Sequence, residues 1–389
     1  MVRIVIIGGG VMGSSLACWL TRDAQRMPEV IVVERDPTYA RASSALSASS
    51  IRQQFSTPVN IEISRFGVEF LRRVGDYLSV DGETPAIGLV EGGYLFLATE
   101  AGLRVLERNH EVQRAHGADV VLLGHEALGE RFPWMNLAGI EAGSLGLSGE
   151  GWFDGWALLQ AFRRRAIAQG ARYLRCEAVA AEREGRRARA VRLEDGTRLE
   201  ADLFVNAAGP WASQVASFFE VGIPVEARRR CVFAFTCPQP PHPCPLVVDP
   251  SGLWFRPEGR GFICGLPPRP EEDLADLPLE VDHEMFEERI WPILADRVPA
   301  FERLRVTGSW AGYYAFNTFD QNALLGFHPE LDNLLFMNGF SGHGLQQAAA
   351  VGRGIAELIL EGRYRSIDLA PLDIARVSRG EPLRERNVV

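Results

Sequence analysis

The opening of the chain combines a strand, a glycine-rich turn, a helix and an acidic residue in one short unit. An apolar, β-branched run at residues 2–7 leads into Gly8, Gly10 and Gly13, and a helical segment follows. A second apolar run then ends at Glu34. Glycines at this spacing permit a tight turn, close approach of backbone to a pyrophosphate and close helix packing, and the carboxylate can accept hydrogen bonds from ribose hydroxyls. The unit predicts a doubly wound α/β sheet that binds a dinucleotide without a ribose phosphate, either NAD or FAD.

Two later segments repeat the order of strand, glycine and helix. One strand candidate spans 203–207 and closes at Gly209, and another spans 333–338 and is followed by a glycine loop and a long helix. The β-rich stretches between them contain an acidic helix predicted near 282–295. Because 389 residues exceed what one core usually supports, we predict two interleaved domains. They are a nucleotide-binding domain (1–85, 150–222 and 325–389) and a β-rich substrate domain with a mixed sheet and flanking helices (86–149 and 223–324).

The composition excludes several classes of protein. All 41 basic residues are arginine, so enzymes that need a catalytic lysine and P-loop NTPases are excluded, and a phosphate must be held by backbone amides or arginine. A net charge of -9 disfavours a nucleic-acid partner. Cys237, His242 and Cys244 lack zinc-site spacing, so no metal is expected. No apolar run is long enough to span a membrane and no signal segment is evident. We therefore expect a cytoplasmic protein.

Three motifs together resemble the family of D-amino-acid oxidase and sarcosine oxidase. They are the opening glycine motif, Asn-Ala-Ala-Gly-Pro-Trp at 206–211 and Gly-Phe-Ser-Gly-His-Gly at 339–344. The resemblance covers essentially the whole chain and implies a Rossmann-like FAD-binding domain of the GR2 type, with a separate six-stranded sheet over the flavin. Within the family, residues 310–322 and 342–347 resemble a mitochondrial branch of FAD-dependent oxidoreductase domain-containing proteins linked to assembly of respiratory complex I.

The resemblance also implies where the cofactor binds. Reduced flavin carries negative charge near N1, which the N-terminus of the last long helix would stabilise. Some relatives attach FAD through a histidine near the N-terminal flavin segment or a cysteine near the pyrimidine edge. Here the first histidine is His110 and the last cysteine is Cys264, so we predict non-covalent FAD. The predicted cofactor residues are Gly8, Gly10, Val11, Met12, Gly13, Glu34, Arg35, Ser43, Ser44, Ser50, Ile51, Val179, Ala208, Gly209, Trp211, Gly312, Gly339, Ser341, Gly342, His343, Gly344, Leu345 and Gln346.

Four residues are candidates for catalysis. In sarcosine-oxidase-like enzymes an arginine at the position of Arg52 fixes the substrate carboxylate, although a structural ion pair is the alternative. Tyr313 and Tyr314 either shape the substrate pocket or serve as aromatic packing. His343 either donates a hydrogen bond to the flavin, transfers a proton or holds its loop.

These features predict an FAD-dependent oxidoreductase that oxidises the C–N bond of an amino acid or N-methylated (secondary) amine by hydride transfer to flavin N5. Sarcosine oxidases carry a lysine where this chain has Gln346, and a second lysine that promotes reaction with oxygen. Neither exists here, so we expect a dehydrogenase that passes electrons to a protein or quinone. Two alternatives stay open: a flavoprotein that assists assembly of a respiratory complex with little turnover, and an NAD-dependent dehydrogenase.

Overall fold

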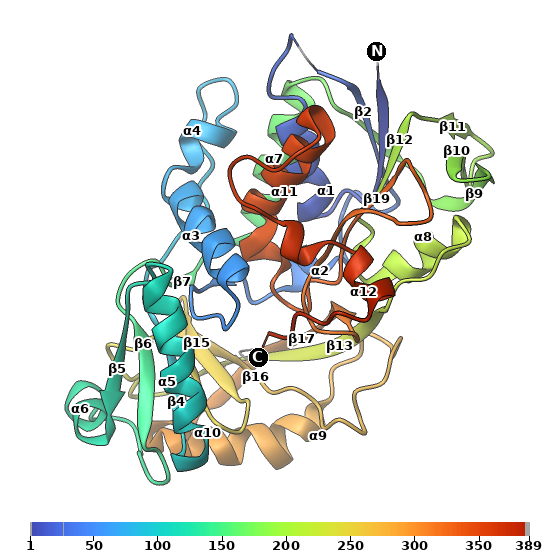
Figure 1. Cartoon of the computed structure of the whole chain (residues 1–389). Coiled ribbons are helices and arrows are strands. Elements are labelled where there is room, and N and C mark those ends of the chain that lie inside the picture. The colour runs from blue at the N-terminus through green and yellow to red at the C-terminus, as the bar shows by residue number, and fades with distance from the viewer. Residues whose placement is uncertain (1, 26, 386–389) are drawn as a thin grey trace.

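The computed structural model describes residues 2–25 and 27–385. Two large β-sheets dominate the described chain: a six-stranded sheet in the upper half of Figure 1 and an eight-stranded sheet in the lower half. Helices flank both sheets. The predicted α/β fold class is therefore confirmed.

The six-stranded sheet contains the first strand of the chain at its centre. Its members are β1 (Arg3–Ile7), β2 (Glu29–Glu34), β8 (Arg172–Arg175), β12 (Leu203–Asn206), β18 (Leu324–Phe327) and β19 (Leu334–Asn338). Their order is β18-β19-β12-β1-β2-β8, and neighbours run parallel except for β18 and β19. Side chains of β1 alternate between two cores: Ile4 and Ile6 face one, and Val5 and Ile7 face the other.

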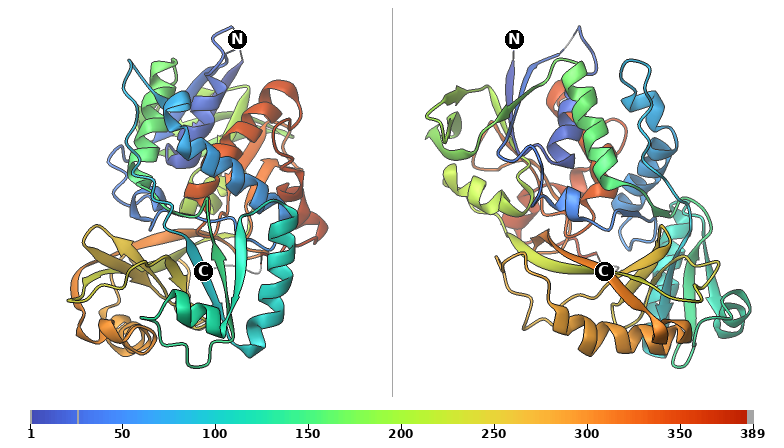
Figure 2. Two further views of the ribbon diagram at one scale, coloured as in Figure 1. Left: turned by 90° about the vertical axis from the view of Figure 1, so that its left-hand side faces the viewer. Right: turned by 180° about the vertical axis from the view of Figure 1, so that it is seen from behind.

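Each face of this sheet is covered differently. Four helices pack on the face of Ile4 and Ile6: α1 (Val11–Leu20), α3 (Pro58–Arg72), α7 (Gly155–Ala168) and α11 (Gly344–Glu361). On the opposite face lie α8 (Ala212–Phe218) and a small sheet of β9 (Ala178–Glu184), β10 (Arg187–Leu193) and β11 (Arg198–Glu200), as Figure 2 shows from behind. The first and last long helices approach closely, because Ser15 Oγ donates to Ala348 O at 2.7 Å. The two ends of the sequence therefore build one helical layer on this face of the sheet.

The second sheet has eight strands, so the expectation of six was wrong. Its members are β4 (Tyr94–Ala98), β5 (Val120–Gly124), β6 (Ala142–Gly146), β13 (Val225–Thr236), β14 (Leu246–Val248), β15 (Trp254–Glu258), β16 (Gly261–Gly265) and β17 (Arg305–Asn317). The order is β17-β13-β16-β15-β14-β4-β6-β5, and only β14 and β4 run parallel within it. The β4–β6 and β5–β6 pairs extend the sheet through the earlier insert, which the resemblance did not anticipate.

Helices of the second part pack on both faces of the eight-stranded sheet. Leu95 and Leu97 of β4 share a core with α6 (His125–Arg131), α9 (His283–Met285) and α10 (Trp291–Arg297). On the opposite face, Tyr94 and Phe96 of the same strand pack with α5 (Glu100–Ala115). The single helix predicted near 282–295 is instead interrupted by a π-helical turn at Phe286–Ile290. Pro292 has no N–H to continue the regular ladder, and it stands in the first turn of α10, where this loss is tolerated.

Short elements complete the chain. They are α2 (Ser43–Leu46), β3 (Ser50–Ile51), α4 (Val74–Leu78), β7 (Gly151–Trp152), α12 (Ala375–Arg379) and 3-10 turns at Gly209–Trp211, Pro299–Arg303 and Ala370–Leu372. Across residues 2–25 and 27–385, no helix combines the length and apolar character needed to cross a membrane.

Strands of the two large sheets come from interleaved segments. The six-stranded sheet draws on residues between 3 and 34, 172 and 206, and 324 and 338, and the eight-stranded sheet on residues between 94 and 146 and between 225 and 317. We keep the two-domain division given above as a proposal; its terminal ranges include residues 1, 26 and 386–389, which lie outside the described chain.

Candidate active site

A cavity of about 540 Å³ lies between the two large sheets. At its nucleotide end, which we define by Gly10 and Glu34, it borders the carboxyl ends of β1 and β2. At its catalytic end, defined by Arg52, Tyr314 and His343, it reaches the eight-stranded sheet. Ligands of open α/β sheets bind beyond the carboxyl ends of the strands, and this volume is typical of a ligand site. One cavity thus joins the two groups of residues that the sequence singled out.

The opening glycines have separate structural roles. Gly8 has φ +103°, and a Cβ there would lie 2.4 Å from Ala207 O. A Cβ at Gly13 would lie 1.9 Å from Gly8 O, so this glycine permits α1 to pack on the turn. Gly10 differs, because its Cβ would meet nothing closer than Ser44 Oγ at 3.5 Å, and it lines the cavity. Gly10 therefore leaves space through which backbone can approach a bound pyrophosphate.

Glu34 is held at the nucleotide end by two backbone amides. Its Oε2 accepts from Gly9 N and its Oε1 from Asp36 N, both at 2.8 Å. Burial raises the pKa of Glu34. Each carboxylate oxygen has a further lone pair. The predicted hydrogen bonds from ribose hydroxyls to Glu34 are therefore compatible with this geometry. The space beside Gly10 stays open.

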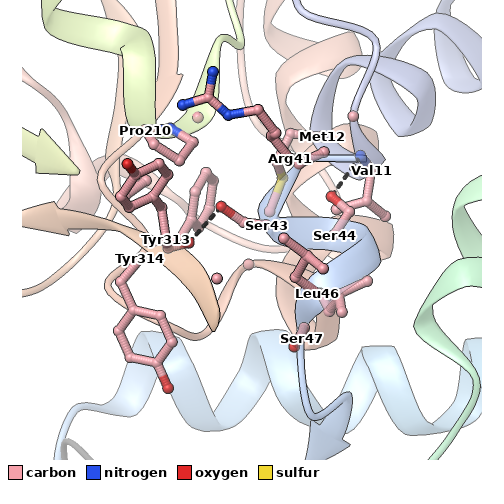
Figure 3. A pocket seen from close by; sticks show the side chains of 18 of the residues that line it. Val11, Met12, Arg41, Ser43, Ser44, Leu46, Ser47, Pro210, Tyr313 and Tyr314 are labelled. Atoms are coloured by element: carbon pink, nitrogen blue, oxygen red, sulfur yellow. Dashed lines mark hydrogen bonds between the residues drawn. The ribbon is translucent and has the colours of Figure 1, made fainter. Parts of the chain in front are cut away.

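An aromatic ring between cations lies beside this end. The Arg35 guanidinium stands 4.0 Å from the Trp211 ring and forms a 3.1 Å ion pair with Glu177. Arg41 lies 5.7 Å from the same ring, and Figure 3 shows its side chain next to Pro210. Sequence reasoning missed Arg41, although the absence of lysine already required arginine or backbone amides for phosphate. A cation on the cavity wall fits the phosphate charge.

The loop before α11 borders the cavity with backbone and small residues. Gly342 has φ +93°, and a Cβ there would lie 2.5 Å from Tyr314 Cε2. Ser341 is fixed on both sides: its N donates to Ala315 O, and its Oγ accepts from Asn317 N, each at 3.0 Å. The N-terminus of α11 follows at once, which suits the negative charge of a reduced flavin.

Arg52 and His343 contact each other at the catalytic end. Arg52 is 1% exposed, donates through Nη1 to Gln54 O, and lies 3.1 Å through Nη2 from His343 Nε2. Because a guanidinium only donates, Nε2 must accept and Nδ1 must carry the proton. Burial and the charge of Arg52 hold the pKa of His343 well below its usual range. The imidazole is therefore neutral, and its Nε2 lone pair already has a donor.

Gln346 serves the same segment. Its Oε1 accepts from the Arg52 backbone N at 3.0 Å. Glu150, which the sequence did not reveal, holds the next two residues: its Oε1 accepts from Gln53 N at 2.6 Å and Gln54 N at 3.1 Å. Burial raises the pKa of Glu150 to about 7. These contacts fix the chain that carries Arg52 under the cavity.

The two tyrosines point in different directions from β17, as Figure 3 shows. Tyr313 OH donates to Leu277 O at 2.6 Å, and its backbone O accepts from Ser43 Oγ at 2.5 Å. Tyr314 is half-buried, and desolvation of its phenol raises the pKa of that group. Both rings line the cavity, so the two roles foreseen for them, pocket wall and packing, coexist.

Most predicted site residues line the cavity, but four do not: Gly13, Ile51, Val179 and Gly339. Val179 is 46% exposed because side chains alternate along β9, and its neighbour Ala178 faces the cavity instead. Gly13 and Gly339 are conformational or packing positions behind the wall. Lining residues that the sequence did not single out include Arg41, Tyr94, Arg230, Leu246 and Trp254.

Within the described ranges, no three His, Cys, Asp or Glu side chains gather as a metal site would require. The cavity residues instead offer backbone, hydroxyl and guanidinium groups.

Comparison with known proteins agrees with this geometry. The profile of the protein family described as FAD dependent oxidoreductase matches residues 3–358. FAD-dependent oxidoreductase domain-containing protein 1 of Xenopus laevis is 45% identical, over 99% of this chain and 84% of that protein. Mouse mitochondrial sarcosine dehydrogenase is 24% identical over 96% of this chain and 41% of that protein. The structure of L-proline dehydrogenase from P. horikoshii has a TM-score of 0.85 at 26% identity, covering 98% of this chain and 99% of that chain.

Proposed function

Because this chain belongs to the family of FAD-dependent oxidoreductases, we propose that it oxidises the C–N bond of an amino acid or N-methylated (secondary) amine. The cofactor is FAD, as predicted. The observation that carries the proposal is the single cavity that joins Gly10 and Glu34 to Arg52, Tyr314 and His343. Bound there, FAD supplies a two-electron acceptor that takes hydride at N5.

The residues of the catalytic end favour a neutral amine with an anionic group nearby. Arg52 and Arg230 both line the cavity and are permanently charged. Positive charge lowers the pKa of a bound ammonium group, which makes the nitrogen lone pair available as the C–N bond is oxidised. His343 is neutral and accepts from Arg52, so it positions that guanidinium, and its Nδ1–H is the group left to donate.

Two findings support the choice of substrate. The chain is similar to a sarcosine dehydrogenase, and its fold is shared with an L-proline dehydrogenase at 26% identity. Both names denote secondary amines that carry a carboxylate. The absence of lysine supports a dehydrogenase that passes electrons to a protein or quinone over a fast oxidase. The predicted cytoplasmic location stays a prediction.

An anaerobic screen tests the proposal. Purified yellow protein is mixed with amino acids and secondary amines, and loss of flavin absorbance is followed. We expect at least one compound to bleach the flavin, and turnover with a dye acceptor to exceed turnover with oxygen. Equal rates with dye and oxygen would contradict the dehydrogenase assignment.

The second candidate is a flavoprotein that assists assembly of a respiratory complex with little turnover. It is supported by the resemblance of residues 310–322 and 342–347 to the assembly-linked branch and by the 45% identity to the Xenopus laevis relative. Failure of every amine in the screen to bleach the flavin would favour it.

A further inference from the structure

Arg230 presents a guanidinium at the catalytic end that is already arranged for a carboxylate. It lies on β13 and stands 5.1 Å above the Tyr314 ring. Its Nη1 donates to Asp273 Oδ1 at 2.7 Å and its Nη2 to Asp273 Oδ2 at 3.1 Å. Two parallel bonds of this kind form the geometry in which arginine recognises carboxylates most strongly. Arg230 lines the cavity, and its side chain is 15% exposed.

Asp273 belongs to the segment 266–278, which connects β16 to the helices beyond. Leu266 and Pro267 at its start line the cavity, whereas Asp273 does not. The segment is fixed nearby by independent bonds, since Tyr313 OH donates to Leu277 O at 2.6 Å and Asp276 N to Ala227 O at 2.9 Å. The bond between Asp273 and Arg230 is therefore one contact among several, and it can exchange without release of the segment.

Arg52 is differently engaged. Its Nη groups contact a backbone carbonyl and His343, and its guanidinium lies 4.2 Å from the Phe55 ring. A substrate carboxylate on these Nη groups would have to replace two protein acceptors of other shapes. On Arg230, a substrate carboxylate would take the place of the Asp273 carboxylate. The guanidinium would then keep two parallel bonds and a negatively charged partner.

We propose that Arg230 binds the carboxylate of the substrate, and that Asp273 occupies this position when substrate is absent. The proposal rests on the proposed function, because it specifies which amines enter the site: those with a free carboxylate. Exchange of the two carboxylates breaks and forms ion pairs only. The displaced Asp273 keeps a cation beside it, since Arg228 Nη1 lies 3.9 Å from its Oδ2.

The test measures binding of benzoate and of its uncharged analogue benzamide to the FAD-loaded protein, from the change in flavin absorbance. Neither compound is an oxidisable substrate, so the result does not depend on amine oxidation. We expect wild-type protein to prefer benzoate. Arg230→Gln should reduce this preference about 10- to 100-fold, the range for loss of a charged bidentate bond.

Two further variants distinguish this role from misfolding or a general charge effect. Asp273→Asn should tighten benzoate binding about 3- to 10-fold and leave benzamide unchanged, because it removes the charge of the internal competitor. Arg228→Gln is the matched control: Arg228 also contacts Asp273 but does not line the cavity, and its loss should leave the preference intact.

Several results would overturn the proposal. They are an unchanged preference in Arg230→Gln, weaker benzoate binding in Asp273→Asn, or a wild-type protein that does not bind benzoate. Loss of the preference in Arg52→Gln alone would return the carboxylate site to Arg52. If amines bleach the flavin of the wild-type protein but Arg230→Gln still prefers benzoate, the proposed function stands and this inference is wrong.

Discussion

The two ends of the cavity are built in different ways. At the nucleotide end, Gly8, Gly10, Gly13 and Glu34 belong to one β1–α1–β2 unit, and their positions follow from local chain geometry. At the catalytic end, the contributing residues come from five distant segments: Arg52 after β3, Tyr94 on β4, Arg230 on β13, Tyr314 on β17 and His343 before α11. Their relative positions depend on the pairing of two sheets rather than on spacing in the sequence.

This difference separates two kinds of constraint. The nucleotide end depends on the absence of side chains, since a single methyl group at Gly13 would overlap Gly8 O. The catalytic end depends on buried polar and ionisable side chains that are held by polar partners, as with Arg52, His343 and Glu150. Substitutions at the first end should therefore affect folding and cofactor retention, and substitutions at the second should affect pH dependence and ligand choice.

The largest effect is expected from Gly13→Ala. Its Cβ would lie 1.9 Å from Gly8 O, and backbone on both sides cannot yield without moving α1. We expect the free energy of unfolding to fall by about 3 kcal/mol, at the upper end for overpacking, and the protein to purify without yellow colour. Chemical denaturation and the ratio of flavin to protein absorbance measure the two effects.

Gly10→Ala is the control for that variant. Its Cβ would meet only Ser44 Oγ at 3.5 Å, an ordinary contact, so the apoprotein should keep its stability while FAD affinity falls. If Gly10→Ala loses as much stability as Gly13→Ala, Gly10 is also needed for packing, and its role is not limited to contact with the cofactor.

An effect of at most similar size, which depends on pH, is expected from Glu150→Gln. Folding raises the pKa of Glu150 from 4.5 to about 7, so between these pH values the native state binds a proton that the unfolded state has lost. The free energy of unfolding therefore falls as pH rises through this window. The variant lacks this contribution, and its stability relative to wild type should rise by up to about 3 kcal/mol between pH 4.5 and pH 7. Denaturation curves across this range measure it.

A difference between variant and wild type that does not change with pH would contradict this account of Glu150. The glutamine keeps an oxygen for the amides of Gln53 and Gln54 but loses the acceptor of Gln54 Nε2. That loss does not depend on pH, so the change of the difference with pH isolates the charge.

The same contrast explains what the sequence could predict. The opening motif identified β1, α1 and β2 and the carboxylate at Glu34, because each depends on neighbours within one supersecondary unit. Arg230 could not be found, since it is one of three consecutive arginines, and only its register opposite Gly312 in β17 brings it to the cavity. Glu150 gave no signal either, because its partners Gln53 and Gln54 lie almost a hundred residues earlier.

The resemblance to the family of D-amino-acid oxidase and sarcosine oxidase predicted site residues that motif spacing alone could not. It placed Arg52, His343 and the loop before α11 at the cavity, where the structure has them. It also implied a six-stranded second sheet, whereas β4 pairs with β14, and β6 and β5 continue the sheet beyond β4 to make eight strands. The family resemblance therefore predicts the residues of the site better than it predicts the number of strands at the edge of the second sheet.

The smallest effect, at the nucleotide end, is expected from Arg35→Ala. Arg35 stands 4.0 Å from the Trp211 ring, and this wall beside Glu34 should be less ordered without it. An exposed cation–π contact contributes about 0.5–1 kcal/mol, so the dissociation constant of FAD should rise about 2- to 5-fold, as followed by quenching of tryptophan fluorescence during titration of apoprotein. Glu177→Gln removes the ion pair with Arg35 but keeps the ring contact, and it should change the constant less than about twofold. If the two variants weaken FAD binding equally, the ion pair rather than the ring contact orders this wall. The nucleotide end would then depend on charge, as the catalytic end does.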